Sequence, residues 1–376
     1  MADAGVQELP ARFVGREQPG ARSLVLFRRQ ACWVIPLDSR RMAAAGLSIY
    51  RPKSRLEAVA WHGARWAMSP LAMSRRGRAG VGLRVELATT LGRWLGRPDL
   101  RFAVAAPQPD RATVAAIAPS GAVLAFGKLA ASETAAVRVR REHDALQMVR
   151  SLLTPGVVNA PEVLFRGAVD GVEVLLISPV GRRPQADPRR LRHEHVRALA
   201  SLVRQAGEQP LRSLLPPRVP IDDEWADLVS VASERLARWE DAPVRPALVH
   251  GDFAPWNVVG HRSGVAAYDW EDAAEEGAPF WDLWHFAIQG AALLGRSSVQ
   301  SLVDAAVRMH GSLGRAVRSY ARIARLPADL AAPVLVAYLA ASGSVVGRHG
   351  GLDRPDRLRG LRYRAGVLAR LLEAWR

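Results

Sequence analysis

The β-like interruption at residues 247–269 constrains the fold of this chain more than any other part of the sequence. Its runs ALVH, NVVG and GVAAYDW are typical of short strands joined by turns. The sequence around it, from Pro184 to the C-terminus, shows mainly helical spacing of its apolar residues. The pattern therefore predicts a β-hairpin inserted into a helical region.

Short β-like runs dominate an earlier part of the chain. From about Leu100, the runs RFAVAA, ATVAAIA and AVLAFGKLA are separated by turn-forming segments. A helical pattern over residues 133–153 comes next, and the runs EVLFRGAV and VEVLLIS follow with Asp170-Gly171 as a hairpin turn. The helices expected after Pro184 cover residues 187–206, 222–240, 281–294, 298–320, 328–346 and 358–375.

This order of elements predicts an α+β, bilobal plan with a small β-rich lobe and a large, mainly helical lobe. Residues 1–99 precede both lobes and contain several Trp and aliphatic residues to bury, so we expect them to pack on the small lobe. The expected parts are an N-terminal extension over residues 1–99, a small lobe over 100–180 and a helical lobe over 181–376.

The N-terminal extension has its own local patterns. Residues 24–36 predict one or two short strands. Residues 55–73 predict a helix interrupted by Pro70, and residues 74–81 predict a flexible connection.

Polar residues around the predicted hairpin have the chemistry that phosphoryl transfer needs. That reaction requires a carboxylate near the attacking hydroxyl and oxygen ligands for Mg²⁺, and little covalent help from the protein. Asp252 can orient the hydroxyl and accept its proton. Asn257 offers an amide oxygen and Asp269 a carboxylate to a metal that keeps several of its waters. An alternative is a tight turn capped by Asp252, which leaves Asn257, one of only two asparagines in the chain, unexplained.

These residues resemble the aminoglycoside phosphotransferase and choline kinase family, a branch of the protein-kinase-like fold. The resemblance covers residues 100–345 and rests on the motifs His250-Gly251-Asp252, Asn257 and Asp269-Trp270-Glu271, with support from Gly277, Pro279 and Asp282-Leu283. It implies that Asp252 is catalytic and that Asn257 and Asp269 hold Mg²⁺. It also implies that Asp282 braces the catalytic loop.

Two neighbouring residues have supporting interpretations. We expect His250 to orient the loop by hydrogen bonding. Glu271 either reaches a metal or is solvated beside it.

Lys128 and Glu142 extend the resemblance to the small lobe. In kinase-like enzymes a strand lysine holds the α- and β-phosphates, and a helix glutamate orients it. Lys128 ends a β-like run, and all but two of the 52 basic residues are arginine, so a compact ammonium group is favoured there. Glu133 is the alternative partner for Lys128, and an ordinary surface lysine beside a solvated Glu142 is the alternative interpretation.

Other nucleotide contacts are expected from position alone. The phosphate-covering loop should lie at residues 106–112, where no glycine occurs, so backbone N–H groups or Arg111 would contact the nucleotide. The base is expected at a hinge near Ile177 and Val180. By contrast, His193 and His195 are expected to lie on an exposed face of a helix.

The net charge of +16 suggests a polyanionic partner at first sight. However, residues 1–100 carry +10, residues 301–376 carry +8 and residues 101–300 carry −2, with no recognised nucleic-acid motif. We therefore do not expect nucleic-acid binding. The acidic residues between Asp269 and Asp282 favour a cationic acceptor, and a solvated acidic loop is the alternative.

We predict a kinase that transfers the γ-phosphoryl group of ATP or GTP to a hydroxyl of an amino sugar, amino alcohol or related metabolite. The alternative is a catalytically silent kinase-like module that binds a nucleotide or a partner. The single cysteine, Cys32, and the absence of a secretory signal or an 18-residue apolar run indicate a cytoplasmic protein with no membrane span. The acceptor, the nucleotide and the oligomeric state remain open.

Overall fold

The structure is a computed structural model with two compact units. It describes residues 10–16, 22–28, 31–49, 59, 61, 63, 78–180, 190–216, 225–261, 264–295, 297–348 and 355–375. The β-rich unit comprises Met1–Gln147 and Pro161–Arg182, and the helical unit comprises Met148–Ala160 and Arg183–Arg376. The predicted α+β class, with a β-rich part and a helical part, is confirmed.

The β-rich unit is built on one antiparallel sheet, which has eight strands within the described residues. The predicted order of three strands, a helix and two strands is confirmed, with α5 (Glu133–Leu152) as the helix. In spatial order the strands are β10 (Val163–Val169), β11 (Val172–Ile177), β8 (Val123–Ala130), β7 (Arg111–Ile117), β6 (Arg101–Gln108), β3 (Ala31–Pro36), β2 (Arg22–Arg28) and β4 (Arg78–Ala79).

Strands from the first 99 residues extend this sheet directly. The strands predicted over residues 24–36 are β2 and β3, and β3 pairs with β6 through Trp33 and Ala105. A separate pair joins β1 (Val14–Arg16) to β5 (Val81–Leu83). Most of the predicted helix over residues 55–73, and residues 74–77 of the predicted connection, lie outside the described residues.

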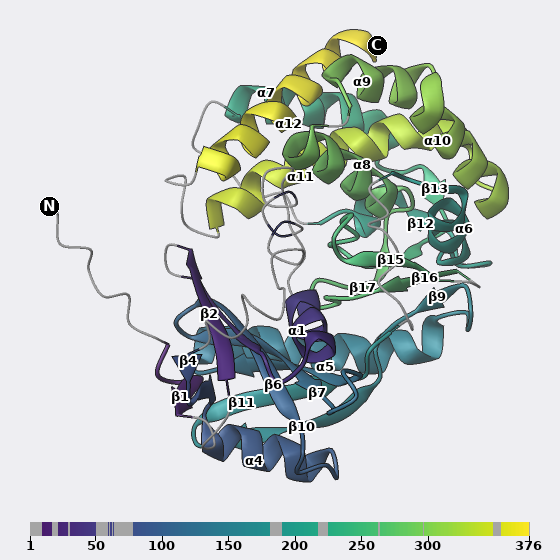
Figure 1. The fold of residues 1–376 in the computed structure, drawn as a ribbon. Helices are drawn as coiled ribbons and strands as arrows, with labels where there is room; N and C mark the ends of the chain where they lie inside the picture. The colour runs from purple at the N-terminus through teal and green to yellow at the C-terminus, as the bar shows by residue number, and fades with distance from the viewer. Residues whose placement is uncertain are drawn as a thin grey trace, which may run out of the picture. The chain divides into compact units, whose positions relative to one another are not determined.

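Alternating side chains give the sheet two buried faces, as the period of two in a strand requires. One face contributes Val34, Val104 and Val114 to a core that also contains Leu87 and Leu91 of α4 (Val85–Trp94). The other face contributes residues such as Ile35 and Ile117, which pack with Met42 of α1 (Arg40–Gly46) and Leu47 of η1 (Leu47–Ile49). Figure 1 shows α1 and α4 beside this sheet.

The helical unit combines a group of helices with a few short strands (Figure 1). Its helices are α6 (His193–Ser201), α7 (Ala226–Leu236), α8 (Trp281–Leu294), α9 (Val299–Val307), α10 (Gly311–Ala324), α11 (Ala331–Arg348) and α12 (Pro355–Ala374), with 3₁₀ turns η2 (Leu211–Leu214), η3 (Ala237–Trp239) and η4 (Ala328–Leu330). Among the described helices, none is both long and apolar enough to cross a membrane.

The single helix predicted over residues 298–320 is wrong, because the chain breaks there into α9 and α10. Met309 and Gly311 both have left-handed backbone conformations, with φ of 55° and 73°. A right-handed helix cannot continue through them. The predicted helix over 187–206 is shorter in the structure, since α6 covers only His193–Ser201 and residues 181–189 lie outside the described residues.

The predicted hairpin is present in the helical unit. It is formed by β15 (Val258–His261) and β16 (Gly264–Ala267), and β9 (Val158–Asn159) pairs with β16 in parallel. Two further antiparallel pairs join β14 (Ala247–Val249) to β17 (Ala274–Gly277) and β12 (Gln209–Pro210) to β13 (Pro243–Val244).

The prediction that His195 lies on an exposed helix face is wrong. Its side chain is fully buried in α6, and its ring centroid lies 5.4 Å from that of Phe286 in α8. Nδ1 of His195 accepts a hydrogen bond from the backbone N–H of Arg192 at 3.0 Å. Burial lowers the pKa of His195 to about 4. The local run of charged residues concealed a core position on the opposite side of the helix.

The burial of His195 predicts a loss of stability in acid. Its folded-state pKa of about 4 lies below the ordinary value of 6.5, so the unfolded chain binds the extra proton first and stability falls as pH drops across that window. Relative to His195→Gln, the wild type should lose up to about 3 kcal/mol between pH 6.5 and pH 4, measured by urea unfolding. Leu199→Ala, a buried change in the same helix, should show a pH-independent difference from the wild type.

Candidate active site

The turn His250–Asp252, here called the HGD turn, follows β14. The side chain of Asp282 in α8 holds the backbone of this turn. Asp282 accepts hydrogen bonds from the backbone N–H groups of His250 at 2.7 Å and Gly251 at 3.1 Å. Burial raises the pKa of Asp282 to about 6, and the two N–H donors act in the opposite direction. The conformation of the turn therefore depends on a buried carboxyl group in the next helix.

Gly251 gives the turn a shape that no other residue fits easily. Its φ is +82°, in the left-handed region. A Cβ at this position would lie 2.2 Å from the backbone oxygen of Asp272. Glycine is therefore required both by the backbone conformation and by the close approach of the chain after β16.

His250 ties the HGD turn to the end of the hairpin. The ring is fully buried, 4.4 Å from Trp270 between ring centroids, and Nε2 lies 2.9 Å from the backbone oxygen of Tyr268. Nδ1 accepts the backbone N–H of Asp252 at 3.3 Å. Burial lowers the pKa of His250 to about 4, so the ring is neutral at pH 7 and both nitrogens are used in the fold.

Asp252 and Asn257 form one hydrogen-bonded unit. Nδ2 of Asn257 donates to Oδ2 of Asp252 at 2.7 Å and to the backbone oxygen of Asp252 at 3.0 Å. Asn257 is buried, whereas the side chain of Asp252 is 34% exposed. Because both amide hydrogens of Asn257 are engaged, its Oδ1 is the atom left to accept or ligate.

Asp269 lies two residues beyond the last residue of β16, in a left-handed conformation with φ of +61°. The N–H of the preceding residue, Tyr268, donates to the backbone oxygen of Asn257 at 2.9 Å. The carboxylates of Asp252 and Asp269 both interact electrostatically with His250. Asp269 and Glu271 are half-buried, so both remain accessible to solvent.

The acidic stretch after the hairpin is partly neutralised. Arg204 pairs with Glu275 at 2.7 Å and with Glu276 at 3.3 Å. Gln209 also donates to Glu276 at 2.7 Å. Two of the acidic side chains in this stretch, Glu275 and Glu276, are therefore already engaged within the fold.

Two further residues at this site, His285 and Tyr338, are not among those that the sequence motifs predict. Nε2 of His285 in α8 lies 2.8 Å from Oδ1 of Asp252, and the hydroxyl of Tyr338 in α11 lies 3.2 Å from Nδ1 of His285. One signal was available, because His285 follows Asp282 by three residues and so shares a helix face with it. Tyr338 carried no local signal.

In the β-rich unit, Lys128 forms an ion pair with Glu142 of α5. Glu142 is fully buried, and the side chain of Lys128 is 19% exposed. The register places Lys128 opposite Thr113 and Leu175, in the middle of the sheet. The alternative partner, Glu133, pairs with Arg140 instead.

The remaining predicted nucleotide-binding residues lie at the margins of the same sheet. Arg111 begins β7 opposite Gln108 at the end of β6, so residues 106–112 are the end of a β-hairpin whose turn is Pro109-Asp110. Asp110 in this turn accepts a hydrogen bond from Ser132 at 2.6 Å, which joins it to the start of α5. Ile177 ends β11 and is buried, and Val180 is half-buried three residues later.

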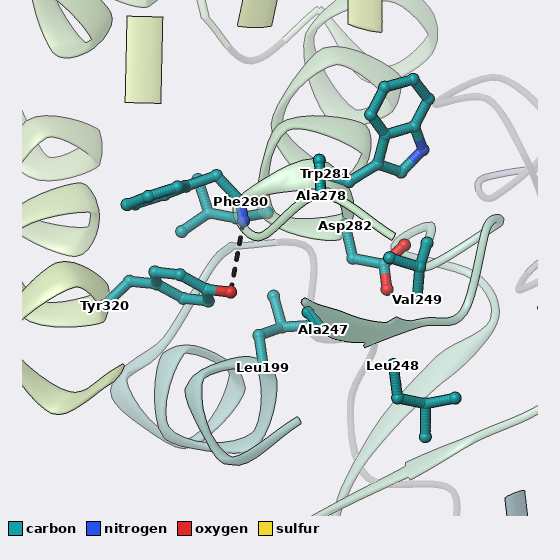
Figure 2. Close-up of a pocket in the computed structure, with 10 residues that line it drawn as sticks. Leu199, Ala247, Leu248, Val249, Ala278, Phe280, Trp281, Asp282 and Tyr320 are labelled. Carbon is teal, nitrogen blue, oxygen red and sulfur yellow. Dashed lines mark hydrogen bonds between the residues drawn. The ribbon is translucent and has the colours of Figure 1, made fainter. Parts of the chain in front are cut away.

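A small cavity lies behind the HGD turn in the helical unit (Figure 2). It has room for about one water molecule, so it is a packing feature and not a substrate pocket. At its edge the hydroxyl of Tyr320 accepts the backbone N–H of Phe280 at 3.2 Å. Its lining residues are Leu199, Ala247, Leu248, Val249, Ala278, Phe280, Trp281, Asp282, Leu283 and Tyr320.

The geometry of the HGD turn predicts opposite effects for two glycine substitutions. Gly251→Ala should lower the free energy of unfolding by about 1–3 kcal/mol from backbone strain alone. Gly290→Ala should raise it by about 0.5–1 kcal/mol, because Gly290 is in α8 and its added Cβ would meet only Pro255, at 3.7 Å. Urea unfolding of both variants measures the difference, and equal effects would contradict the strained geometry.

No family model matches this chain, and no curated protein matches it. Solved structures do match. A candidate fructosamine-3-kinase from Thermobifida fusca is 16% identical with a TM-score of 0.51, covering 75% of this chain and 98% of that chain.

Two further structures match less closely. An aminoglycoside phosphotransferase in ternary complex with AMP-PNP and hygromycin B is 14% identical with a TM-score of 0.49, covering 77% of this chain and 99% of that chain. A candidate aminoglycoside phosphotransferase from Ralstonia eutropha is 16% identical with a TM-score of 0.46, covering 73% and 92% of the two chains. At these identities the likeness to the Thermobifida protein shows the fold alone: this chain has the α+β, protein-kinase-like fold that its motifs predict.

Proposed function

We propose that the protein is a kinase that transfers the γ-phosphoryl group of ATP or GTP to a hydroxyl of a small molecule. The observation that carries the proposal is the hydrogen-bonded unit of Asp252 and Asn257. It combines a solvent-accessible carboxylate with an amide oxygen directed away from that carboxylate, on a turn that a buried Asp282 holds rigid. Phosphoryl transfer depends mainly on such positioning.

In this mechanism Asp252 orients the acceptor hydroxyl and takes its proton. The acceptor oxygen then bonds to the γ-phosphorus, and the bond between that phosphorus and the oxygen bridging to the β-phosphate breaks. The proton moves to the carboxylate of Asp252, and the nucleoside diphosphate leaves with the bridging oxygen. His250 does not take part in proton transfer, because it is buried, neutral and hydrogen-bonded through both nitrogens.

The donor set fits Mg²⁺. Oδ1 of Asn257 and the carboxylate of Asp269 would hold it, with Glu271 near enough in sequence to contribute. Within the described part of the chain, no three His, Cys, Asp or Glu side chains cluster as a complete metal site. Mg²⁺ suits so sparse a set, since it retains waters and binds phosphate oxygens. When bound, it would neutralise charge on the phosphates.

Lys128 and Glu142 would contribute to nucleotide binding. The buried Glu142 fixes the ammonium group of Lys128, which would bind the α- and β-phosphates. Arg111 would add a charge or backbone contact to the phosphates, and the backbone at Ile177 and Val180 would bind the base. We accordingly assign nucleotide binding to residues 100–180, and the catalytic turn and the acceptor site to residues 181–376.

The acceptor is proposed to be an amino sugar, amino alcohol or related metabolite. Asp269, Glu271 and Asp272 lie close in sequence to one another and would attract a cationic group. The matching structure from Thermobifida is that of a candidate fructosamine-3-kinase. A panel of amino sugars, amino alcohols and neutral sugars therefore tests the class.

The role of Asp252 predicts a selective loss of turnover. Asp252→Asn keeps the size of the side chain but removes the base, so phosphoryl transfer should fall about 10²- to 10⁴-fold. Nucleotide binding in the presence of Mg²⁺, measured by calorimetry, should be retained. Asp329→Asn, at an exposed carboxylate of η4, is the matched control and should turn over like the wild type.

Three outcomes separate the possibilities. Absence of nucleotide binding by the wild type would refute the kinase proposal. Binding without turnover on any acceptor would favour the catalytically silent module. Full turnover by Asp252→Asn would refute the assigned base and leave the reaction class intact.

The role of Lys128 predicts that arginine cannot replace it. Lys128→Arg preserves the charge, but the planar guanidinium is larger than the ammonium group that pairs with the buried Glu142. Affinity for the nucleotide should fall about tenfold. Calorimetry measures the change, and Arg140→Lys, at the neighbouring ion pair with Glu173, should leave the affinity unchanged.

A further inference from the structure

Asp252 has a second partner that the proposed mechanism does not use. While Oδ2 accepts from Asn257, Oδ1 lies 2.8 Å from Nε2 of His285. We propose that His285, itself held by Tyr338, is a positioning residue that fixes the carboxylate of Asp252 for the reaction. This inference rests on the proposed function, since it assigns a partner to the proposed base.

Side-chain contacts connect Tyr338 in α11 and His285 in α8 to Asp252 in the HGD turn. His285 projects from α8 and is 8% exposed, and Tyr338 projects from α11 and is 4% exposed. The two rings meet edge to face, with centroids 5.8 Å apart. Trp281, one turn before His285, packs edge to face on Tyr338 at 5.1 Å. Both side chains are therefore fixed by packing as well as by hydrogen bonds.

One arrangement of hydrogens satisfies the contacts that join Asp252, His285 and Tyr338. Nε2 of His285 also lies 3.2 Å from Nε2 of Gln289, and in this arrangement both nitrogens are donors, so they form no hydrogen bond with each other. An ionised Asp252 can only accept, so Nε2 of His285 carries the hydrogen and donates to Oδ1. In the tautomer that carries its hydrogen on Nε2, Nδ1 accepts the hydroxyl hydrogen of Tyr338, whose oxygen can accept from the guanidinium of Arg364 in α12. Burial raises the pKa of Tyr338, so the phenol keeps the hydrogen that this arrangement requires.

The series of contacts from Tyr338 through His285 to Asp252 supports a role beyond packing. A histidine with a purely structural role forms its hydrogen bonds to groups inside the fold, as His250 does with the backbone oxygen of Tyr268. The buried groups of Tyr338 and His285 instead end on a carboxylate that is 34% exposed and has no need of a buried partner. With one oxygen held by His285 and the other by Asn257, the carboxylate cannot rotate away from the acceptor hydroxyl.

The key variant is Tyr338→Phe, which removes one hydroxyl and leaves the ring packing in place. Tyr363→Phe is the matched control, because its hydroxyl donates to the backbone oxygen of Ser297 at 2.9 Å, apart from this chain of contacts. His285→Ala removes the donor to Asp252, and His285→Gln restores an N–H donor. Each protein is measured with ¹⁵N-labelled histidine and by the couplings that report the χ1 rotamer of Asp252.

We expect the wild type to show an Nε2-protonated His285 and a single Asp252 rotamer. Tyr338→Phe should shift the Nδ1 resonance of His285, broaden the rotamer distribution and lower kcat about 3- to 10-fold with the nucleotide KM unchanged. His285→Ala should lower kcat about 10- to 100-fold, and His285→Gln should recover part of it. Tyr363→Phe should match the wild type in every measurement.

The failures are distinguishable. If the Asp252 rotamer and kcat are unchanged in both Tyr338→Phe and His285→Ala, the positioning role is refuted while the kinase stands. If the wild type has no nucleotide turnover, the proposed function is refuted. The rotamer measurement still decides in that case, since an Asp252 that is equally ordered in His285→Ala and in the wild type overturns the positioning by His285.

Discussion

The buried carboxyl group of Asp282 is the constraint on which the candidate site depends. A buried carboxylate is costly unless hydrogen bonds compensate it, and here the backbone N–H groups of His250 and Gly251 do so. Asp282 stands in the first turn of α8, where the helix dipole also favours negative charge. Phe280, with a left-handed φ of 65° and its N–H bonded to Tyr320, sets the start of that helix. The geometry at Asp252 therefore depends on the backbone conformation at the start of α8.

Local sequence predicted the residues that lie near one another in the chain. The β-like runs NVVG and GVAAYDW predicted the hairpin, and Asp252, Asn257 and Asp269 were placed around it, because turns and short strands are encoded within a few residues. The burial of His195 and the break between α9 and α10 were missed, since charge and periodicity do not reveal left-handed residues or which helix face packs inward. His285 and Tyr338 are 53 positions apart, and only tertiary packing brings them together.

The charged residues of the sequence could be interpreted only after the structure showed which residues they pair with. The acidic residues between Asp269 and Asp282 suggested a cationic acceptor, but Arg204 and Gln209 engage two of them, Glu275 and Glu276. The position of Lys128, one of the two lysines, was more informative than the positions of the many arginines. Lys128 pairs with a fully buried Glu142, which is an arrangement that a surface residue would not require.

The pairing of β3 with β6 has a consequence for the boundaries of the β-rich unit. A chain shortened to begin at Leu100 would leave the outer edge of β6 without the hydrogen bonds that Cys32, Trp33 and Val34 now supply. It would also uncover apolar side chains on both faces of the sheet. An exposed apolar edge strand invites pairing with another copy. The first strands of this protein thus cover an edge of β6 that would otherwise be open to pairing.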